Sequence, residues 1–159
     1  MKWIAIVIFF VIGSHSFAQS VIIPDFRFAR MDNGKDFVKK DIPAGKKTLF
    51  VFFDITCPHC KMALTQYNEK SKYLNDINII LITKDDKTEV QQFLNKVAGN
   101  LIIKKNLTIL SDTYNQFVWK FKPSKYPSMF LYTSKQTLIK YSDEESDVSE
   151  FVKLITSKS

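Results

Sequence analysis

The sequence predicts an α/β domain with a mixed central sheet flanked by helices. Two runs of β-branched, aliphatic and aromatic residues, Thr48–Phe53 and Ile77–Thr83 (interrupted only by Asn78), are typical of strands that are buried on both faces. A segment of helical length follows each of them. Two later runs, Ser128–Tyr132 and Thr137–Tyr141, are joined by a short turn and indicate an antiparallel pair at a sheet edge. Strands that alternate with helices favour this fold class.

Four segments are predicted to be helical. The first, Cys60–Leu74, comes soon after the first buried strand. The second, Thr88–Val97, has apolar residues on one face and is preceded by Asp85 and Asp86, either of which is a suitable cap. The other two are a helix that carries Phe117, Val118 and Phe121 behind a cap at Asp112 or Thr113, and a closing helix over Asp147–Thr156.

Composition limits the possible classes of protein. A chain of 159 residues, 45% of them hydrophobic, is long enough for one domain with one sheet. Two cysteines exclude a scaffold built on many disulfides. The net charge of +7 comes almost entirely from lysine, since Arg27 and Arg30 are the only arginines. Nucleic-acid recognition favours arginine, so we interpret this charge as a solvated lysine surface and expect no nucleic-acid partner.

The first residues have the pattern of a secretory signal peptide. Lys2 precedes an apolar run over Trp3–Ile12, and small residues stand at Ser16 and Ala18, as a cleavage site requires. The alternative is a membrane anchor, but about ten apolar residues are half of what a bilayer span needs. We expect cleavage after Ala18, so that residues 1–18 are a signal peptide and 19–159 form one domain in an oxidising, exported compartment.

Both cysteines lie in one motif, Cys57-Pro58-His59-Cys60, directly after the first buried strand. Cys57 is expected at a helix N-terminus, where free N–H groups and the helix dipole stabilise a thiolate, the nucleophile of disulfide exchange. Cys60 lies one turn further on, within reach of a disulfide with Cys57. A protonated His59 would stabilise the thiolate further, and Pro58 is compatible with the first helical position. The motif therefore predicts a redox-active pair.

Two other interpretations of the motif stay open at this stage. In the first, the disulfide is inert and only holds the loop of a non-catalytic binding module. In the second, Cys57, His59 and Cys60 are ligands of a metal such as zinc or copper. Residues 19–159 contain no further Cys or His, so the fourth ligand would have to be a carboxylate, water or another chain. We expect no metal and no cofactor besides the Cys57–Cys60 disulfide.

A proline stands just before the third predicted strand, in Tyr126-Pro127. Proline at a strand entrance often marks a special backbone geometry. If this peptide bond is cis and faces the cysteine motif, the backbone of Tyr126 is placed to pair with an extended substrate segment. The alternative is an ordinary loop proline.

Taken in order, these segments resemble the exported TlpA-like thiol–disulfide oxidoreductases of the thioredoxin fold, which are grouped with redoxin domains. The resemblance covers roughly Ile23 to Ile155. The matching segments are Ile23–Phe26 (opening segment), Asn33–Lys35 (hairpin turn), Phe52–Cys60 (strand and active-site loop), Leu110–Asp112, and Tyr126-Pro127 (cis-proline loop). The sequence C-P-H-C itself resembles that of DsbA-type oxidases, but the chain is too short for the helical domain that DsbA inserts.

The resemblance implies a thioredoxin-like fold and an enzyme that exchanges disulfides with protein substrates. Cys57 and Cys60 would be catalytic with His59 and Pro58, and Pro127, Tyr126 and Thr56 would contact substrate. We expect a reductase or general redox-maintenance protein that acts as a monomer in the periplasm, with secretion as the alternative. Its partners would be protein thiols and disulfides and a redox partner protein, with a membrane electron donor as one candidate.

Three positions depart from the pattern of related families. Thioredoxin has a buried acid six residues before its first cysteine, where this chain has Val51, and a tryptophan where it has Thr56. Asp54 is the nearest carboxylate in sequence and is either a proton acceptor for Cys60, a brake on Cys57, or a loop cap. Peroxiredoxins share the fold but need Thr or Ser at the position of Asp54, and a downstream arginine. Neither arginine of this chain lies downstream, so we do not expect peroxidase activity.

Overall fold

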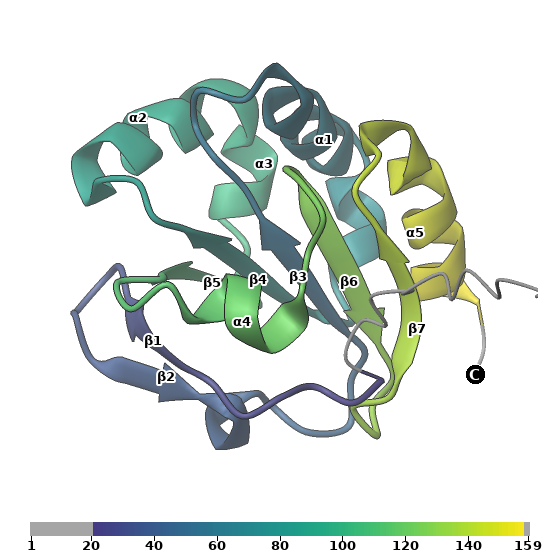
Figure 1. Cartoon of the computed structure of the whole chain (residues 1–159). Coiled ribbons are helices and arrows are strands. Elements are labelled where there is room, and N and C mark those ends of the chain that lie inside the picture. The colour runs from purple at the N-terminus through teal and green to yellow at the C-terminus, as the bar shows by residue number, and fades with distance from the viewer. Residues whose placement is uncertain (1–20, 158–159) are drawn as a thin grey trace, which may run out of the picture.

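The computed structural model describes residues 21–157, which form one seven-stranded sheet with helices on both faces (Figure 1). The predicted signal peptide, residues 1–18, lies outside the described residues. The strands are β1 (Arg27–Arg30), β2 (Asp36–Val38), β3 (Thr48–Phe52), β4 (Asn78–Thr83), β5 (Leu107–Ser111), β6 (Ser128–Tyr132) and β7 (Leu138–Ser142).

The sheet is mixed, as predicted. Its order is β2-β1-β5-β4-β3-β6-β7, in which β3, β4 and β5 are parallel, while β6 runs antiparallel to β3 and β7 antiparallel to β6. Strand β3 therefore lies inside the sheet, with β4 on one side and β6 on the other. All five of its residues are buried, which explains why its sequence is continuously apolar instead of alternating.

Helices α1 (Pro58–Glu69), α2 (Lys87–Val97), α3 (Gly99–Ile102) and α5 (Val148–Thr156) cover one face of the sheet, and α4 (Gln116–Phe121) lies on the other (Figure 1). Three short 3-10 helices, η1 (Lys39–Asp41), η2 (Ser71–Leu74) and η3 (Glu145–Asp147), lie in the connections after β2, α1 and β7. Within residues 21–157 no helix has the length and hydropathy needed to cross a bilayer.

Alternate residues of β3, together with Phe53, which directly follows it, face two separate apolar cores. Leu49, Val51 and Phe53 pack with buried residues of α1, α2, α3 and α5. Phe50 and Phe52 face the opposite side and belong to a core dominated by aromatic rings, which includes Phe117 and Phe121 of α4. The rings of Phe52 and Phe117 are 4.3 Å apart, and those of Phe117 and Phe121 are stacked at 4.4 Å. The many phenylalanines of the sequence thus fill the core beneath α4.

Several predicted boundaries need correction. The predicted helix Cys60–Leu74 is two elements, because α1 begins at Pro58 and ends at Glu69, and Lys70 leaves helical geometry before η2. The last strand is shifted by one residue from the predicted Thr137–Tyr141, next to an irregularity in its pairing with β6. Strand β5 was not predicted from its sequence.

Of each pair of predicted helix caps, one residue forms the capping hydrogen bond. The Asp86 carboxylate accepts from the backbone N–H of Thr88 and caps α2, which leaves Asp85 for another purpose. The Asp112 carboxylate, not Thr113, accepts from the backbone N–H groups of Gln116 and Phe117 at the start of α4.

Candidate active site

The two cysteines lie where the chain passes from β3 into α1. Cys57 is the N-cap of α1, as predicted, and the backbone N–H of Cys60 donates to its Sγ across 3.4 Å. Pro58 occupies the first helical turn, where its missing N–H costs nothing. The free N–H groups at the start of the twelve-residue α1 are therefore directed towards the Cys57 sulfur.

The two thiols differ in exposure. Both are free in this structure, with Cys57 partly exposed and Cys60 completely buried. Burial raises the pKa of the Cys60 thiol far above its ordinary value, and an interaction with the backbone of Asp54 opposes this only in part. Cys60 therefore keeps its proton at neutral pH. An incoming group reaches Cys57 first, and Cys60 lies behind it as the second sulfur.

Two aspartates accept hydrogen bonds from the loop between β3 and α1, just before Cys57. Asp54 accepts through one carboxylate oxygen from the backbone N–H and the hydroxyl of Thr56, at 2.7 and 2.6 Å. Asp85 reaches across from the end of β4 and accepts from the backbone N–H of Ile55 at 2.9 Å and from the Thr83 hydroxyl at 2.7 Å. The bonds of Asp54 are those of a loop cap. Its predicted role in proton transfer stays a prediction.

His59 has a partner that sequence reasoning missed. Its Nδ1 lies 3.0 Å from Oε1 of Glu145, in η3. The hydrogen bond from His59, together with a backbone hydrogen bond, lowers the pKa of the Glu145 carboxyl. The only available signal was the acidic run over 143–147, and nothing in the sequence indicates that this run folds back onto α1.

The predicted proline loop faces the cysteines. The Tyr126–Pro127 peptide bond is cis, and the carbonyl oxygen of Tyr126 lies 4.0 Å from the Sγ of Cys57. The Tyr126 ring packs on Phe52 at 4.9 Å between centroids, and burial raises the pKa of its hydroxyl, with a smaller contribution from the Asp54 charge. Pro127 is buried, so any substrate contact in this loop would be made by the backbone and by Tyr126.

A small hollow of about 130 Å³ lies beside this loop. It is lined by Phe52, Val118, Pro123, Ser124, Lys125 and Tyr126. On α4 next to it, the apolar side chains of Val118 and Trp119 are 43% and 80% exposed. Exposed apolar surface therefore adjoins the loop that carries the Tyr126 carbonyl.

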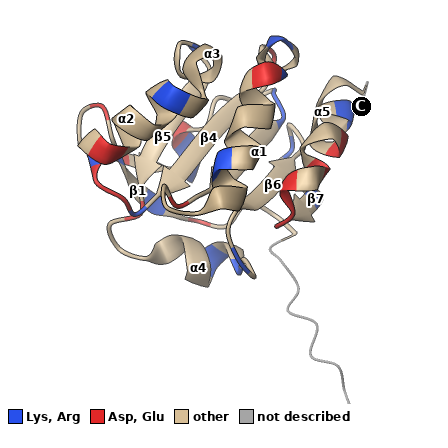
Figure 2. Ribbon diagram, turned by 90° about the horizontal axis from the view of Figure 1, so that it is seen from above, with Lys and Arg blue, Asp and Glu red and all other residues tan. Residues whose placement is uncertain are grey.

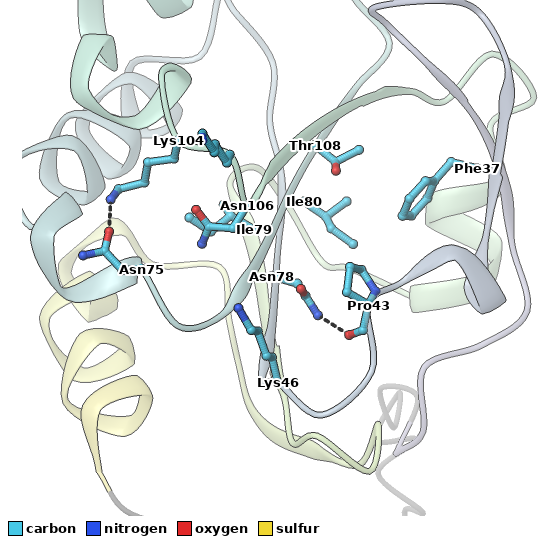
Figure 3. Close-up of a pocket in the computed structure, with 11 residues that line it drawn as sticks. Phe37, Pro43, Lys46, Asn75, Asn78, Ile79, Ile80, Lys104, Asn106 and Thr108 are labelled. Atoms are coloured by element: carbon cyan, nitrogen blue, oxygen red, sulfur yellow. Dashed lines mark hydrogen bonds between the residues drawn. The ribbon is translucent and has the colours of Figure 1, made fainter.

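A larger hollow of about 500 Å³ lies away from the cysteines, where strands β4 and β5 begin (Figure 3). Asn78 donates to the Pro43 carbonyl and Asn106 to the carbonyls of Leu74 and Ile77, so these amides serve the structure of the surrounding loops. In parallel sheets, chemistry is found at the opposite, carboxyl ends of the strands, which is where Cys57 lies.

The remaining residues considered as candidates from the sequence do not form part of this site. Val51 is buried in the core that also contains Cys60, so no carboxylate takes the place of the thioredoxin acid there. Arg27 and Arg30, both in β1, pair with Asp36 and Asp32. Among residues 21–157, no three His, Cys, Asp or Glu side chains are grouped so as to hold a metal ion.

The comparison with protein families matches the AhpC/TSA family over residues 20–141, which include the cysteine motif, the proline loop and six of the seven strands. The chain belongs to the AhpC/TSA family. A comparison with curated protein sequences gave no match.

Solved structures place this family member in the thioredoxin-like fold. A thioredoxin-like protein from Aeropyrum pernix superposes with a TM-score of 0.67 at 12% identity, covering 82% of this chain and 89% of that one. StoA from Bacillus subtilis gives 0.61 at 17% identity, covering 84% and 98%. A secreted Mycobacterium tuberculosis disulfide oxidoreductase homologous to E. coli DsbE gives 0.60 at 20% identity, covering 81% and 95%. The predicted thioredoxin-like fold is confirmed.

Proposed function

We propose that this AhpC/TSA family member is a thiol–disulfide oxidoreductase that exchanges disulfides with protein substrates through Cys57 and Cys60. The observation that supports it best is the unequal pair itself, an accessible sulfur at a helix N-terminus with a buried, protonated thiol one turn behind it. A disulfide that only held a loop would need neither feature. The chemistry needs no external cofactor.

The proposed reaction has two exchange steps. In the reducing direction, the Cys57 thiolate attacks one sulfur of a substrate disulfide, and the other substrate sulfur leaves as a thiolate. Cys60 then loses its proton and attacks the Cys57 sulfur, which releases the second substrate thiolate and closes the Cys57–Cys60 disulfide. Two electrons have passed from the protein dithiol to the substrate, and a redox partner with a dithiol must restore them. Oxidation of a substrate dithiol is the same path reversed.

Substrate would lie along the proline loop. The Tyr126 carbonyl beside Cys57 is placed to accept a backbone hydrogen bond from an extended segment, and Thr56, the residue before Cys57, is exposed. The exposed apolar side chains Val118 and Trp119 extend this surface and would contact apolar residues that flank the substrate cysteine.

We propose that the protein acts as a monomer in the periplasm after export, as a reductase or redox-maintenance protein. The signal-peptide pattern of residues 1–18 supports the exported location. It agrees with the similar structures, among which are a lipoprotein thioredoxin of Streptococcus pneumoniae and the secreted oxidoreductase of Mycobacterium tuberculosis.

The proposal is tested by trapping its intermediate. With Cys60→Ala, the mixed disulfide between Cys57 and a substrate protein cannot resolve, so covalent adducts should accumulate in the exported fraction of cells and disappear on reduction. The matched variant Cys57→Ala should trap nothing, because Cys60 is buried. Equal trapping by both variants, or none by either, would contradict the proposal.

A further inference from the structure

An acidic segment, Asp143–Asp147, joins β7 to α5 and contacts both segments that flank Cys57. Glu145 pairs with His59 at 3.0 Å, and its neighbour Glu144 pairs with Lys125 of the proline loop at 2.5 Å. Figure 2 shows part of this segment as a red stretch beside α1. Residues far apart in the sequence are thus joined at the active site by two consecutive glutamates.

The two glutamates are held differently. Glu144 is 55% exposed, whereas Glu145 is only 18% exposed. The side chain of Gln66, from α1, donates to the Glu145 carbonyl at 3.1 Å and ties this residue to the helix that carries His59. Asp147, at the end of η3, pairs with Lys140 of β7. Contacts from two elements therefore fix the position of Glu145 relative to the imidazole.

This contact fixes the orientation of the His59 ring. A carboxylate can only accept at Nδ1 if this nitrogen carries a hydrogen, so the contact with Glu145 fixes Nδ1 as a donor and sets the orientation of the ring. The same hydrogen bond lowers the pKa of the Glu145 carboxyl, which therefore stays ionised as the acceptor. The nearby Lys125 also lowers the pKa of this carboxyl. A protonated imidazole held in this position, two residues from Cys57, would stabilise the Cys57 thiolate.

We propose that Glu145 is a positioning residue that holds the His59 imidazole in one orientation at the start of α1, and thereby makes the Cys57–Cys60 pair more oxidising. The inference rests on the proposed disulfide exchange at these cysteines. A stabilised thiolate lowers the free energy of the reduced form, so the protein disulfide accepts electrons more readily.

The test measures the equilibrium at pH 7 in which the protein disulfide and two glutathione thiols give the protein dithiol and glutathione disulfide. Replacing Glu145 by Gln keeps the shape of the side chain but removes its charge. We expect E145Q to shift this equilibrium about three- to tenfold towards the protein disulfide, a potential about 15 to 30 mV lower.

Two controls separate this effect from general electrostatics. E144Q removes the same charge one residue away but leaves the His59 contact intact, so it should shift the equilibrium less than twofold. In a His59→Gln background, E145Q should have no effect, since the group through which it acts is gone. Thermal unfolding of each variant verifies that it is folded.

The outcomes are distinct. A shift towards the dithiol in E145Q, an equal shift in E144Q, or a shift that persists without His59 would each overturn the role of Glu145. A wild-type couple that E145Q leaves unchanged would overturn this inference alone. A wild-type protein with no reversible couple would contradict the proposed function, and the inference with it.

Discussion

The backbone N–H of Cys60 donates to the Sγ of Cys57 across 3.4 Å, so the first cysteine of the motif is also the cap of α1. One side chain therefore stabilises the helix and presents the reactive sulfur. The same geometry places the Cys57 sulfur beside the partial positive charge of the helix N-terminus. Cys60, one turn further along α1, is buried in the core.

The capping role predicts a difference between two substitutions of Cys57. Serine keeps an acceptor for the helix N–H groups and alanine does not, so Cys57→Ala should be less stable than Cys57→Ser by about 1 kcal/mol. Urea unfolding under reducing conditions measures the difference. Equal free energies of unfolding would show that a capping acceptor at position 57 does not stabilise α1.

Asp85 is predicted to support the reactive loop. Removal of its carboxylate in Asp85→Ala leaves the backbone N–H of Ile55 and the Thr83 hydroxyl without their acceptor and should cost about 1.5–3 kcal/mol. The alkylation rate of Cys57 should change as well, because the loop loosens. Asp86→Ala is the matched control, since it removes only the α2 cap, about 1 kcal/mol, and should leave the alkylation rate unchanged. The expectation fails if both variants alter alkylation equally.

Asp54→Asn separates the loop role of this residue from proton transfer. Asparagine retains an oxygen that accepts from Thr56, but it cannot take a proton from Cys60. The attack of Cys60 on a mixed disulfide at Cys57 should therefore slow at least tenfold. The free energy of unfolding should change by less than about 0.5 kcal/mol. Release of a coloured aromatic thiol from Cys57 follows this step. Thr56→Ala disturbs the loop without removing the base and should leave the rate unchanged. An unchanged rate in Asp54→Asn would leave Asp54 as a loop cap alone.

Stability of the reduced protein should fall at alkaline pH. The folded-state pKa of Cys60 is raised by burial, so its contribution to stability is complete below the pKa of an unfolded thiol, about 8.5, and is lost as the pH rises towards the folded value. The slope from this group approaches about 1.4 kcal/mol per pH unit. Buried Tyr67, whose pKa is also raised, adds to the loss only above about pH 10.

Urea unfolding between pH 8 and 9.5 measures this slope. Reduced Cys60→Ala should lack most of it, because the titrating thiol is absent. A wild-type slope equal to that of Cys60→Ala would contradict the raised pKa.

The parts of the fold that the sequence predicts are those with local signals. The apolar runs of β3 and β4 and the Asp86 cap of α2 are of this kind. Strand β5 was not predicted because its residues are mostly half-buried and follow α3 closely. Its sequence therefore shows neither a long apolar run nor a clear alternation of apolar and polar residues. The break at Lys70 also has no local signal, since the sequence there contains neither proline nor glycine.

The candidate site divides in the same way. The motif Cys57–Cys60 and the Tyr126-Pro127 loop are recognisable by residue type, and the structure brings them together. Asp85 and Glu145 were not recognised as parts of the site, because their contacts depend on how β4 and η3 are placed beside α1. A carboxylate on the surface and a carboxylate beside a catalytic group have the same sequence signature.

The equilibrium reduction potential of the Cys57–Cys60 pair in glutathione buffers tests the central claim most directly. A two-electron oxidoreductase of this fold should show one reversible couple between about −270 and −120 mV. Within this range, a value below about −220 mV supports reduction of substrates, and one above about −180 mV supports their oxidation. A pair that shows no reversible couple with glutathione would contradict the account.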